Sequence, residues 1–214
     1  MVFGLNNVKK SIITGVLMDK KYKLTSETCM SRGHTLYRIQ ALNEFGNVTA
    51  GNLGGFIEFE SNLSQVGNCW VSDNARIFGK ARVDEDAQVY GNARVFGDAH
   101  VSENARVFGN ARVNGEVQIF GHAQVYGKAQ VYGNVRVLGD ASIYEDSRVS
   151  GHAWISGHVQ ISGDAWISGT GAHGTVWMSR DVKLDHGIWN ETVQLNNHSW
   201  YVVSTTLKKV LLGY

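Results

Sequence analysis

The stretch ARVFGDAHVSENARVFGNARV, residues 93–113, contains Ala-Arg-Val-Phe-Gly twice and decides the fold. A β-branched residue recurs every six residues through this stretch and far beyond it. Counted from Val71, the same position holds Val or Ile in seventeen consecutive six-residue units, the last at Ile167, without an insertion. Such unbroken repetition at a short period is typical of a solenoid, in which each repeat stacks on its neighbours.

Each six-residue unit combines a short strand with a turn. A small residue, mostly alanine, alternates with polar residues around the β-branched position, which is the inward and outward alternation of a strand. Glycine followed by a polar residue usually separates the strands, and glycine readily adopts the positive φ that tight turns require. The period excludes a helix, whereas three strands and three corners per 18-residue coil satisfy the backbone hydrogen bonds. Each strand then pairs in parallel with the strand one coil later, at about 4.8 Å.

We therefore predict an all-β chain built around a single-stranded parallel β-helix over residues 59–172. Residues 1–58 are predicted to form an N-terminal extension and cap, and residues 173–214 irregular final coils and a C-terminal cap. Caps are expected because the ends of a β-helix expose unpaired strand edges that must be covered. Cys69 falls on the small inward position and is predicted to be a buried structural thiol.

Composition excludes several classes of protein. The 20 basic and 19 acidic side chains give a net charge of +1, so no bulk charge favours strong non-specific binding to nucleic acid or to an anionic membrane. No apolar run reaches the roughly 20 residues needed to span a membrane. Two cysteines do not make a disulfide framework, which favours a reducing compartment, and we expect the cytoplasm.

The 18-residue period sorts the outward side chains into three faces. On one face, aromatic residues stack on four successive coils in a patch larger than a soluble monomer usually exposes, which predicts self-association, most simply as a trimer. On another, arginines run beside aromatic residues, which favours an anionic partner: an acidic protein surface, a nucleotide or a single strand. Alternatively, both columns only stabilise the ladder. The predicted self-association residues are Tyr90, Phe108, Tyr126 and Tyr144, and the predicted partner-binding residues are Arg76, Arg94, Arg112, Arg148, Phe78, Phe96 and Tyr132.

A hydrophobic first position and a small fifth position resemble the pattern of hexapeptide-repeat proteins, best known as trimeric acyltransferases that use acyl-CoA. The resemblance covers residues 59–172 and implies a left-handed β-helix. Glycine lies at the third position here, whereas the enzymes often carry it second, so a right-handed triangular coil of the bactofilin type remains the alternative. A closer resemblance, to uncharacterised hexapeptide-repeat proteins of phages, prophages and bacteria, implies a viral or mobile-element source. It rests on KYKLTSET (21–28), LYRIQAL (36–42), AGNLGGFIE (50–58) and NLSQVGNCWV (62–71).

In the acyltransferases a histidine base lies where a loop interrupts the coil and removes a proton from the acceptor. No such loop interrupts residues 71–168, and the histidines of the repeat occupy ordinary outward or corner positions without an evident carboxylate partner. Three residues share one corner column, but a ladder points them in parallel, whereas a metal site needs them to converge. We therefore predict no catalytic residue, no cofactor and no metal site. The repeat histidines are His100, His122, His152 and His158, and the corner column is His122, Asp140 and His158.

These observations favour a non-enzymatic binding or scaffold protein that binds or blocks a component of a bacterial host, including a defence protein or its nucleotide signal. The alternative is an acyl-CoA-dependent acyltransferase with its site between subunits. A protein that polymerises coil on coil through its ends is a third possibility, but the non-repetitive segments at both ends argue against it.

Overall fold

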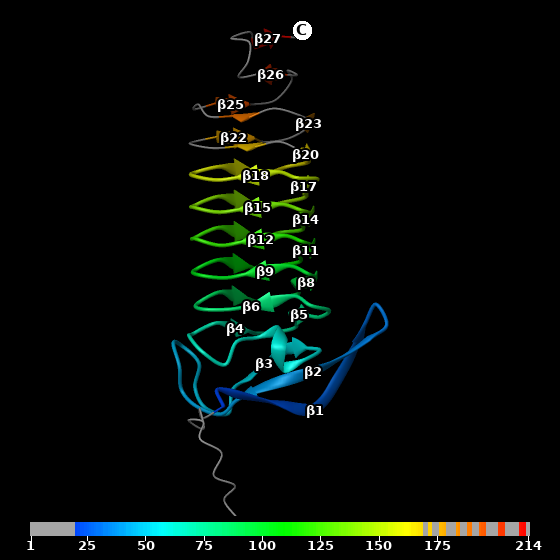
Figure 1. Ribbon diagram of the computed structural model, residues 1–214, viewed down its shortest axis with the longest axis vertical. Coiled ribbons are helices and arrows are strands. Elements are labelled where there is room, and N and C mark those ends of the chain that lie inside the picture. The colour runs from blue at the N-terminus through cyan, green and yellow to red at the C-terminus, as the bar shows by residue number, and fades with distance from the viewer. Residues whose placement is uncertain are drawn as a thin grey trace, which may run out of the picture.

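A computed structural model describes residues 20–168 and a series of strands beyond them. The described chain is almost entirely β-structure, with one 3-10 helix, η1 (Glu60–Asn62). Figure 1 shows a column of stacked coils with a long hairpin at its N-terminal end. The first 19 residues of the predicted N-terminal extension and cap, residues 1–58, lie outside the described residues.

The strands of the coils form three sheets, one on each side of the column. We call the outer side of the ten-stranded sheet the arginine face, that of the eight-stranded sheet the aromatic face, and that of the seven-stranded sheet the third face. The ten-stranded sheet contains β1 (Tyr22–Ser31), β2 (His34–Ala41), β3 (Leu53–Ile57), β5 (Arg76–Ile77), β8 (Arg94–Gly97), β11 (Arg112–Gly115), β14 (Gln130–Gly133), β17 (Arg148–Ser150), β20 (Trp166–Ser168) and β23 (Lys183–Leu184). The eight-stranded sheet contains β4 (Trp70–Val71), β7 (Gln88–Val89), β10 (Arg106–Val107), β13 (Gln124–Val125), β16 (Ser142–Ile143), β19 (Gln160–Ile161), β22 (Val176–Met178) and β25 (Val193–Leu195). The seven-stranded sheet contains β6 (Arg82–Val83), β9 (His100–Val101), β12 (Gln118–Ile119), β15 (Arg136–Val137), β18 (Trp154–Ile155), β21 (Gly171–Ala172) and β24 (Ile188–Trp189).

The strand register confirms the predicted coil. Arg94 of β8 pairs in parallel with Arg76 and Arg112, one coil before and one coil after it. Corner hydrogen bonds repeat the same interval, since the backbone N–H of Glu103 donates to the carboxylate of Glu85, 18 residues earlier, at 2.9 Å. The chain is therefore a parallel β-solenoid with three short strands per coil, and the left-handed sense of the coil stays a prediction.

The interior of the coils is filled by the two columns expected from the repeat. The Val and Ile positions and the small positions are buried, as Val95 and Ala93 illustrate at 0% exposure each. Cys69 is also buried, as predicted, and burial raises the pKa of its thiol. The amine of Lys21 lies 3.3 Å from the Cys69 sulfur and 3.0 Å from the Cys69 carbonyl oxygen, so the thiol is enclosed by the N-terminal segment.

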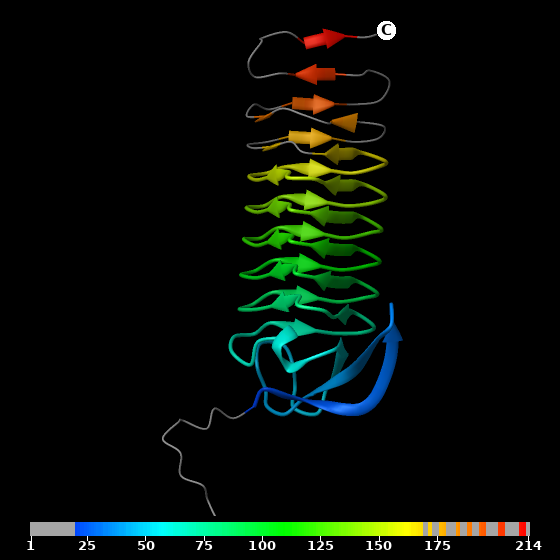
Figure 2. The same ribbon diagram turned by 45° about the vertical axis from the view of Figure 1, so that its right-hand side comes forward.

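The N-terminal segment covers the first coil and continues the ten-stranded sheet. Strands β1 and β2 form an antiparallel hairpin, and β3 pairs antiparallel with β2 and parallel with β5. Figure 2 shows this hairpin reaching along the side of the column. Leu36 and Phe56 pack outside the coil, against Phe78, in a second small hydrophobic cluster. The hairpin thus protects the edge of the first coil and also covers part of the arginine face.

Strand pairing continues past residue 172, where the predicted β-helix ends. β22 pairs in parallel with β19 and β25, β23 pairs with β20, and β24 pairs with β21. The last two strands, β26 (Tyr201–Val203) and β27 (Val210–Leu212), form an antiparallel pair. No described part of the chain forms a helix with the length and hydropathy needed to cross a membrane.

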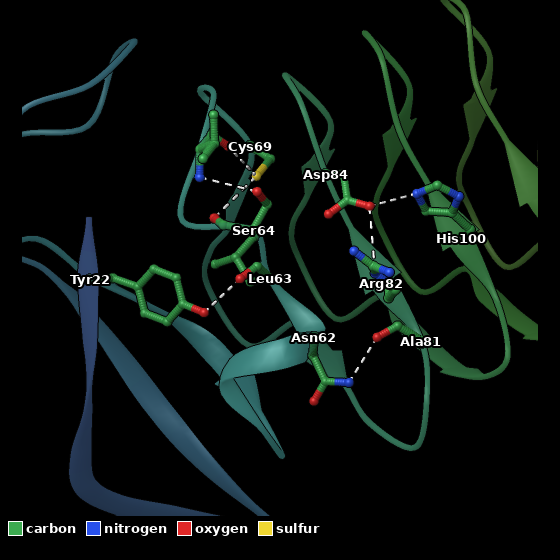
Figure 3. Close-up of polar contacts among 10 residues, drawn as sticks. Tyr22, Asn62, Leu63, Ser64, Cys69, Ala81, Arg82, Asp84 and His100 are labelled. Atoms are coloured by element: carbon green, nitrogen blue, oxygen red, sulfur yellow. Dashed lines mark hydrogen bonds and ion pairs between the residues drawn. The ribbon is translucent and has the colours of Figure 1, made fainter. Parts of the chain in front are cut away.

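Tyr22 joins the cap to the first coil, and its ionisation is expected to lower the stability of the protein at alkaline pH. Its buried hydroxyl donates to the Leu63 carbonyl oxygen at 2.7 Å (Figure 3), and desolvation raises the pKa of the phenol. An unfolded tyrosine titrates near pH 10, so the stability that this group contributes is complete below about pH 10 and is lost as the pH rises further. We expect Tyr22→Phe to destabilise the protein by about 1 kcal/mol at pH 8 and by progressively less toward pH 11.

Urea unfolding followed by circular dichroism at pH 8, 10 and 11 measures this difference. Tyr37→Phe, on the exposed side of the hairpin, is the matched loss of a hydroxyl. A Tyr22→Phe difference that stayed constant across these pH values would contradict the role of the buried phenol.

Candidate binding faces

The structure contains the predicted arginine column on the arginine face. Arg76, Arg94 and Arg112 occupy consecutive rungs of the arginine face, and Arg148 follows after Gln130. Among the described residues, the ion pairs of the protein include none of these four arginines. The parallel register therefore aligns guanidinium groups of like charge on neighbouring coils.

The electrostatics are most unfavourable at Arg94. Partial burial lowers the pKa of its guanidinium, and the positive charges of Arg76, Arg112 and Arg32 lower it further. The Nε atom of Arg76 is buried and has no hydrogen-bond partner in the described part of the chain. An anion bound beside Arg76 and Arg94 would reduce the repulsion between their guanidinium groups and accept charge-assisted hydrogen bonds from them.

The N-terminal hairpin changes which aromatic residues of the arginine face are accessible. The predicted exposure of Phe78 is wrong, because Leu36 and Phe56 cover it and leave it 2% exposed. Phe96 stacks on Phe78 with ring centroids 4.8 Å apart and is half-buried. Tyr132 lies two rungs beyond Phe96 and is also half-buried. Phe96 and Tyr132 therefore keep only part of their surface accessible, whereas Phe78 is structural.

Arg32, a residue not predicted from the sequence, joins this face from the tip of the hairpin. It adopts φ 50° in the turn between β1 and β2. Its guanidinium carbon lies 4.8 Å from the centroid of the Phe96 ring. Arg-Gly between two alternating strands is a signal for a turn, but nothing in the sequence shows where the tip of that turn lands.

A groove continues the arginine face toward the C-terminal coils. It has a volume of about 670 Å³ and mixed charge, because the exposed ion pair between Lys128 and Asp146, 3.6 Å long, lies in it. The arginine column thus ends in a hollow rather than on a flat surface. The lining residues are Asn110, Arg112, Lys128, Gln130, Asp146, Arg148, Asp164 and Trp166.

The aromatic face carries the predicted column of rings. Tyr90, Phe108, Tyr126 and Tyr144 stack with centroids 4.8, 4.7 and 4.9 Å apart and nearly parallel planes. Each ring is half-buried, because the ring faces cover one another and the outer edges stay accessible. The column stabilises the coil, and its role in self-association stays a prediction.

The third face holds a histidine and carboxylate pair that the sequence analysis missed. His100 Nε2 lies 2.7 Å from Asp84 Oδ2, and Arg82 Nε lies 3.7 Å from the same oxygen (Figure 3). The expectation that the repeat histidines lack a carboxylate partner is therefore wrong for His100, and also for His122 and His158, which both lie within ion-pair distance of Asp140. Asp84 and His100 are separated by 16 residues, so they meet diagonally between coils and not along a rung.

The predicted corner column places Asp140 between two histidines. His122 Nδ1 lies 3.7 Å from one Asp140 oxygen, and His158 Nδ1 lies 3.4 Å from the other. All three side chains are exposed. In the part of the chain that the structure describes, no three His, Cys, Asp or Glu side chains group as metal ligands would. This column is a line of exposed ion pairs, which stabilise a surface weakly.

Comparison with known proteins places the repeats in a described class. The family model described as YdcK Beta solenoid repeat matches residues 87–103, 105–121 and 129–145. Over 47 residues the chain is 49% identical to a protein of Escherichia coli (strain K12) named uncharacterized acetyltransferase YdcK. This similarity covers 22% of the chain and 14% of the relative, so most of the relative has no counterpart in the match. The repeat matches and the parallel β-solenoid together fit the pattern of hexapeptide-repeat β-helix proteins.

Proposed function

We propose that this protein is a non-enzymatic binding protein that holds an anionic partner on its arginine face. The observation that carries the proposal is the run Arg76, Arg94 and Arg112 on consecutive coils, none of them in an ion pair with a described carboxylate. Like charges about 4.8 Å apart repel by roughly 1 kcal/mol even at the dielectric constant of water. A bound anion converts this repulsion into charge-assisted hydrogen bonds.

The geometry of the column favours an elongated partner. Side chains on a β-ladder point in parallel, so the column presents a line of charges and not a cage. The groove continues this line from Arg112 to Arg148 and Trp166. An acidic segment of a host protein or a nucleotide is the kind of partner that such a rigid surface accommodates.

The cellular context is part of the same proposal. A phage or prophage source, inferred from the resemblance of the N-terminal stretches, makes a host component the natural partner, including a defence protein or its nucleotide signal. Trimers that pack through the aromatic column would leave the arginine face free, because the two columns lie on different sides of the coil.

An acyltransferase is the second candidate function. Two observations favour it: the E. coli relative is named an acetyltransferase, and His100 is paired with Asp84. A histidine oriented by a carboxylate can act as a general base, and Asp84 and Arg82 line a pocket of about 610 Å³. In this alternative, coenzyme A binds the folded protein and stabilises it.

Removing two arginines separates these functions. We expect Arg94→Ala with Arg112→Ala to weaken binding of fluorescein-labelled polyglutamate, or of a labelled single-stranded oligonucleotide, by at least about tenfold at 150 mM salt. Fluorescence anisotropy measures the affinity. The matched control is Arg106→Ala with Arg136→Ala, which removes the same charge from exposed positions on the other two faces.

Two results would count against the proposal. Equal losses in both double variants would mean that only net charge matters, and unchanged affinity in Arg94→Ala with Arg112→Ala would exclude this face. Saturable thermal stabilisation by coenzyme A that survives the loss of both arginines would favour the acyltransferase instead.

A further inference from the structure

The arginine face has one place where guanidinium groups arrive from two different elements. Arg94 projects from β8, within the ladder of the coils, and Arg32 comes from the turn of the β1–β2 hairpin. Phe96, over which Arg32 lies, is two residues from Arg94 on the same outer side of β8. Arg32 therefore reaches the face beside Arg94 from outside the ladder, whereas the other arginines of the column belong to the ladder itself.

Packing holds Arg32 in this position. The hairpin bearing it is anchored by Leu36, which is 0% exposed, and by Cys29, which packs against the same cluster as Phe96. A guanidinium over an aromatic ring is attracted to the ring face and keeps its N–H groups directed outward in its own plane. Arg32 is exposed at the hairpin tip, so these N–H groups can donate to a ligand.

The carboxylates nearest to the hairpin are already engaged. Glu27 lies 2.8 Å from Arg38 Nε, and Glu58 lies 2.9 Å from His34 Nδ1 while its other oxygen accepts the Gly79 N–H at 2.8 Å. In the described part of the chain, neither Arg32 nor Arg94 has an ion pair. The junction between the hairpin and the coil therefore has an uncompensated positive charge, to which Arg76 and Arg112 add.

We propose that Arg32 and Arg94 bind a phosphoryl group, whether of a nucleoside monophosphate or of free phosphate. The proposal rests on the proposed function and names the ligand of the same face. A phosphate dianion offers three acceptor oxygens in different directions, so it accepts guanidinium forks from two elements at once. A planar carboxylate is matched by a single fork, which each arginine of the ladder already provides by itself. Guanidinium groups from two different elements on one face thus favour phosphate.

Isothermal titration calorimetry of the full chain at pH 7.5 and 150 mM chloride tests this site. Adenosine monophosphate and inorganic phosphate are titrated, with adenosine and the dicarboxylate glutarate as comparisons. We expect saturable binding of the phosphates and at least about tenfold loss of affinity in Arg32→Ala and in Arg94→Ala. Arg94→Lys keeps the charge without the fork and should fall between Arg94→Ala and the unaltered protein. Arg136→Ala, on the third face, should bind as the unaltered protein does.

The outcomes distinguish the sources of the phosphate and the two proposals. Tighter binding of the monophosphate than of inorganic phosphate indicates the nucleotide, and equal affinities indicate free phosphate at the same site. Three results would overturn the inference: no binding of either phosphate, binding that neither arginine substitution weakens, or binding of glutarate as tight as that of phosphate.

If phosphate does not bind while polyglutamate binding still depends on Arg94 and Arg112, the proposed function survives and the phosphoryl site does not. If phosphate binding depends on Arg32 while the double variant leaves polyanion binding unchanged, the elongated-partner function fails alone. Circular dichroism of Arg32→Ala checks that the hairpin variant is folded.

Discussion

Ile119→Asp is expected to destabilise the β-helix by more than about 4 kcal/mol, whereas Gln118→Asp should change stability by less than about 1 kcal/mol. The two residues are neighbours on the same two-residue strand, β12, but face opposite ways. Ile119 is 0% exposed between Val101 and Val137, and an aspartate there would bury a charge among aliphatic side chains. Gln118 is exposed between His100 and Arg136, where a carboxylate stays hydrated.

Urea unfolding of both variants, followed by circular dichroism, measures the contrast. Each coil contacts only its neighbours, so a defect in the middle of the column weakens the coils on both sides of it. Ile119→Val should lower stability by about 1 kcal/mol, because it removes one methylene and keeps the β-branch. Similar unfolding midpoints for Ile119→Asp and Gln118→Asp would mean that Ile119 of β12 is not buried in the core.

The fold was predictable because its information is local and periodic. The inward column and the pairing of β8 with β11 follow from the six-residue repeat alone, since every coil presents the same side chains to the next. The non-repetitive N-terminal segment carries no such signal. Its hairpin covers Phe78 through Leu36, a contact between residues with unrelated patterns, so the burial of Phe78 could not be inferred from the repeat.

The candidate sites also divide into those that follow from the repeat and those that depend on contacts outside it. The arginine and aromatic columns follow from counting 18 residues, because rungs align identical positions on successive coils. Arg32 depends on where the hairpin tip lands. The His100–Asp84 pair depends on side chains that lean diagonally between coils, 16 residues apart. Contacts between unlike positions need side-chain geometry, which periodicity does not contain.

Gly115→Ala is expected to cost about 3 kcal/mol or more, whereas Gly33→Ala should cost only about 1 kcal/mol. The two glycines have almost the same φ, 87° at Gly115 and 88° at Gly33. An added Cβ at Gly115 would lie 2.7 Å from the Gly133 carbonyl oxygen and 2.9 Å from the Gly133 nitrogen, on the next coil. At Gly33, in the hairpin turn, it would meet nothing within 4 Å.

This pair of variants therefore separates two reasons for a glycine at the corner: its positive φ and the close approach of the next coil. Both alanines pay the strain of a left-handed conformation, but only Ala at position 115 must also push two coils apart. Chemical denaturation of the two variants measures the difference in unfolding free energy. Equal losses would mean that glycine is needed at the corners for φ alone. A larger loss in Gly115→Ala would show that the spacing between coils, about 4.8 Å, leaves no room for a side chain there. In that case Gly97, Gly115 and Gly133 form a ladder of close backbone contacts between successive coils. The corner then requires close packing just as the buried aliphatic column does.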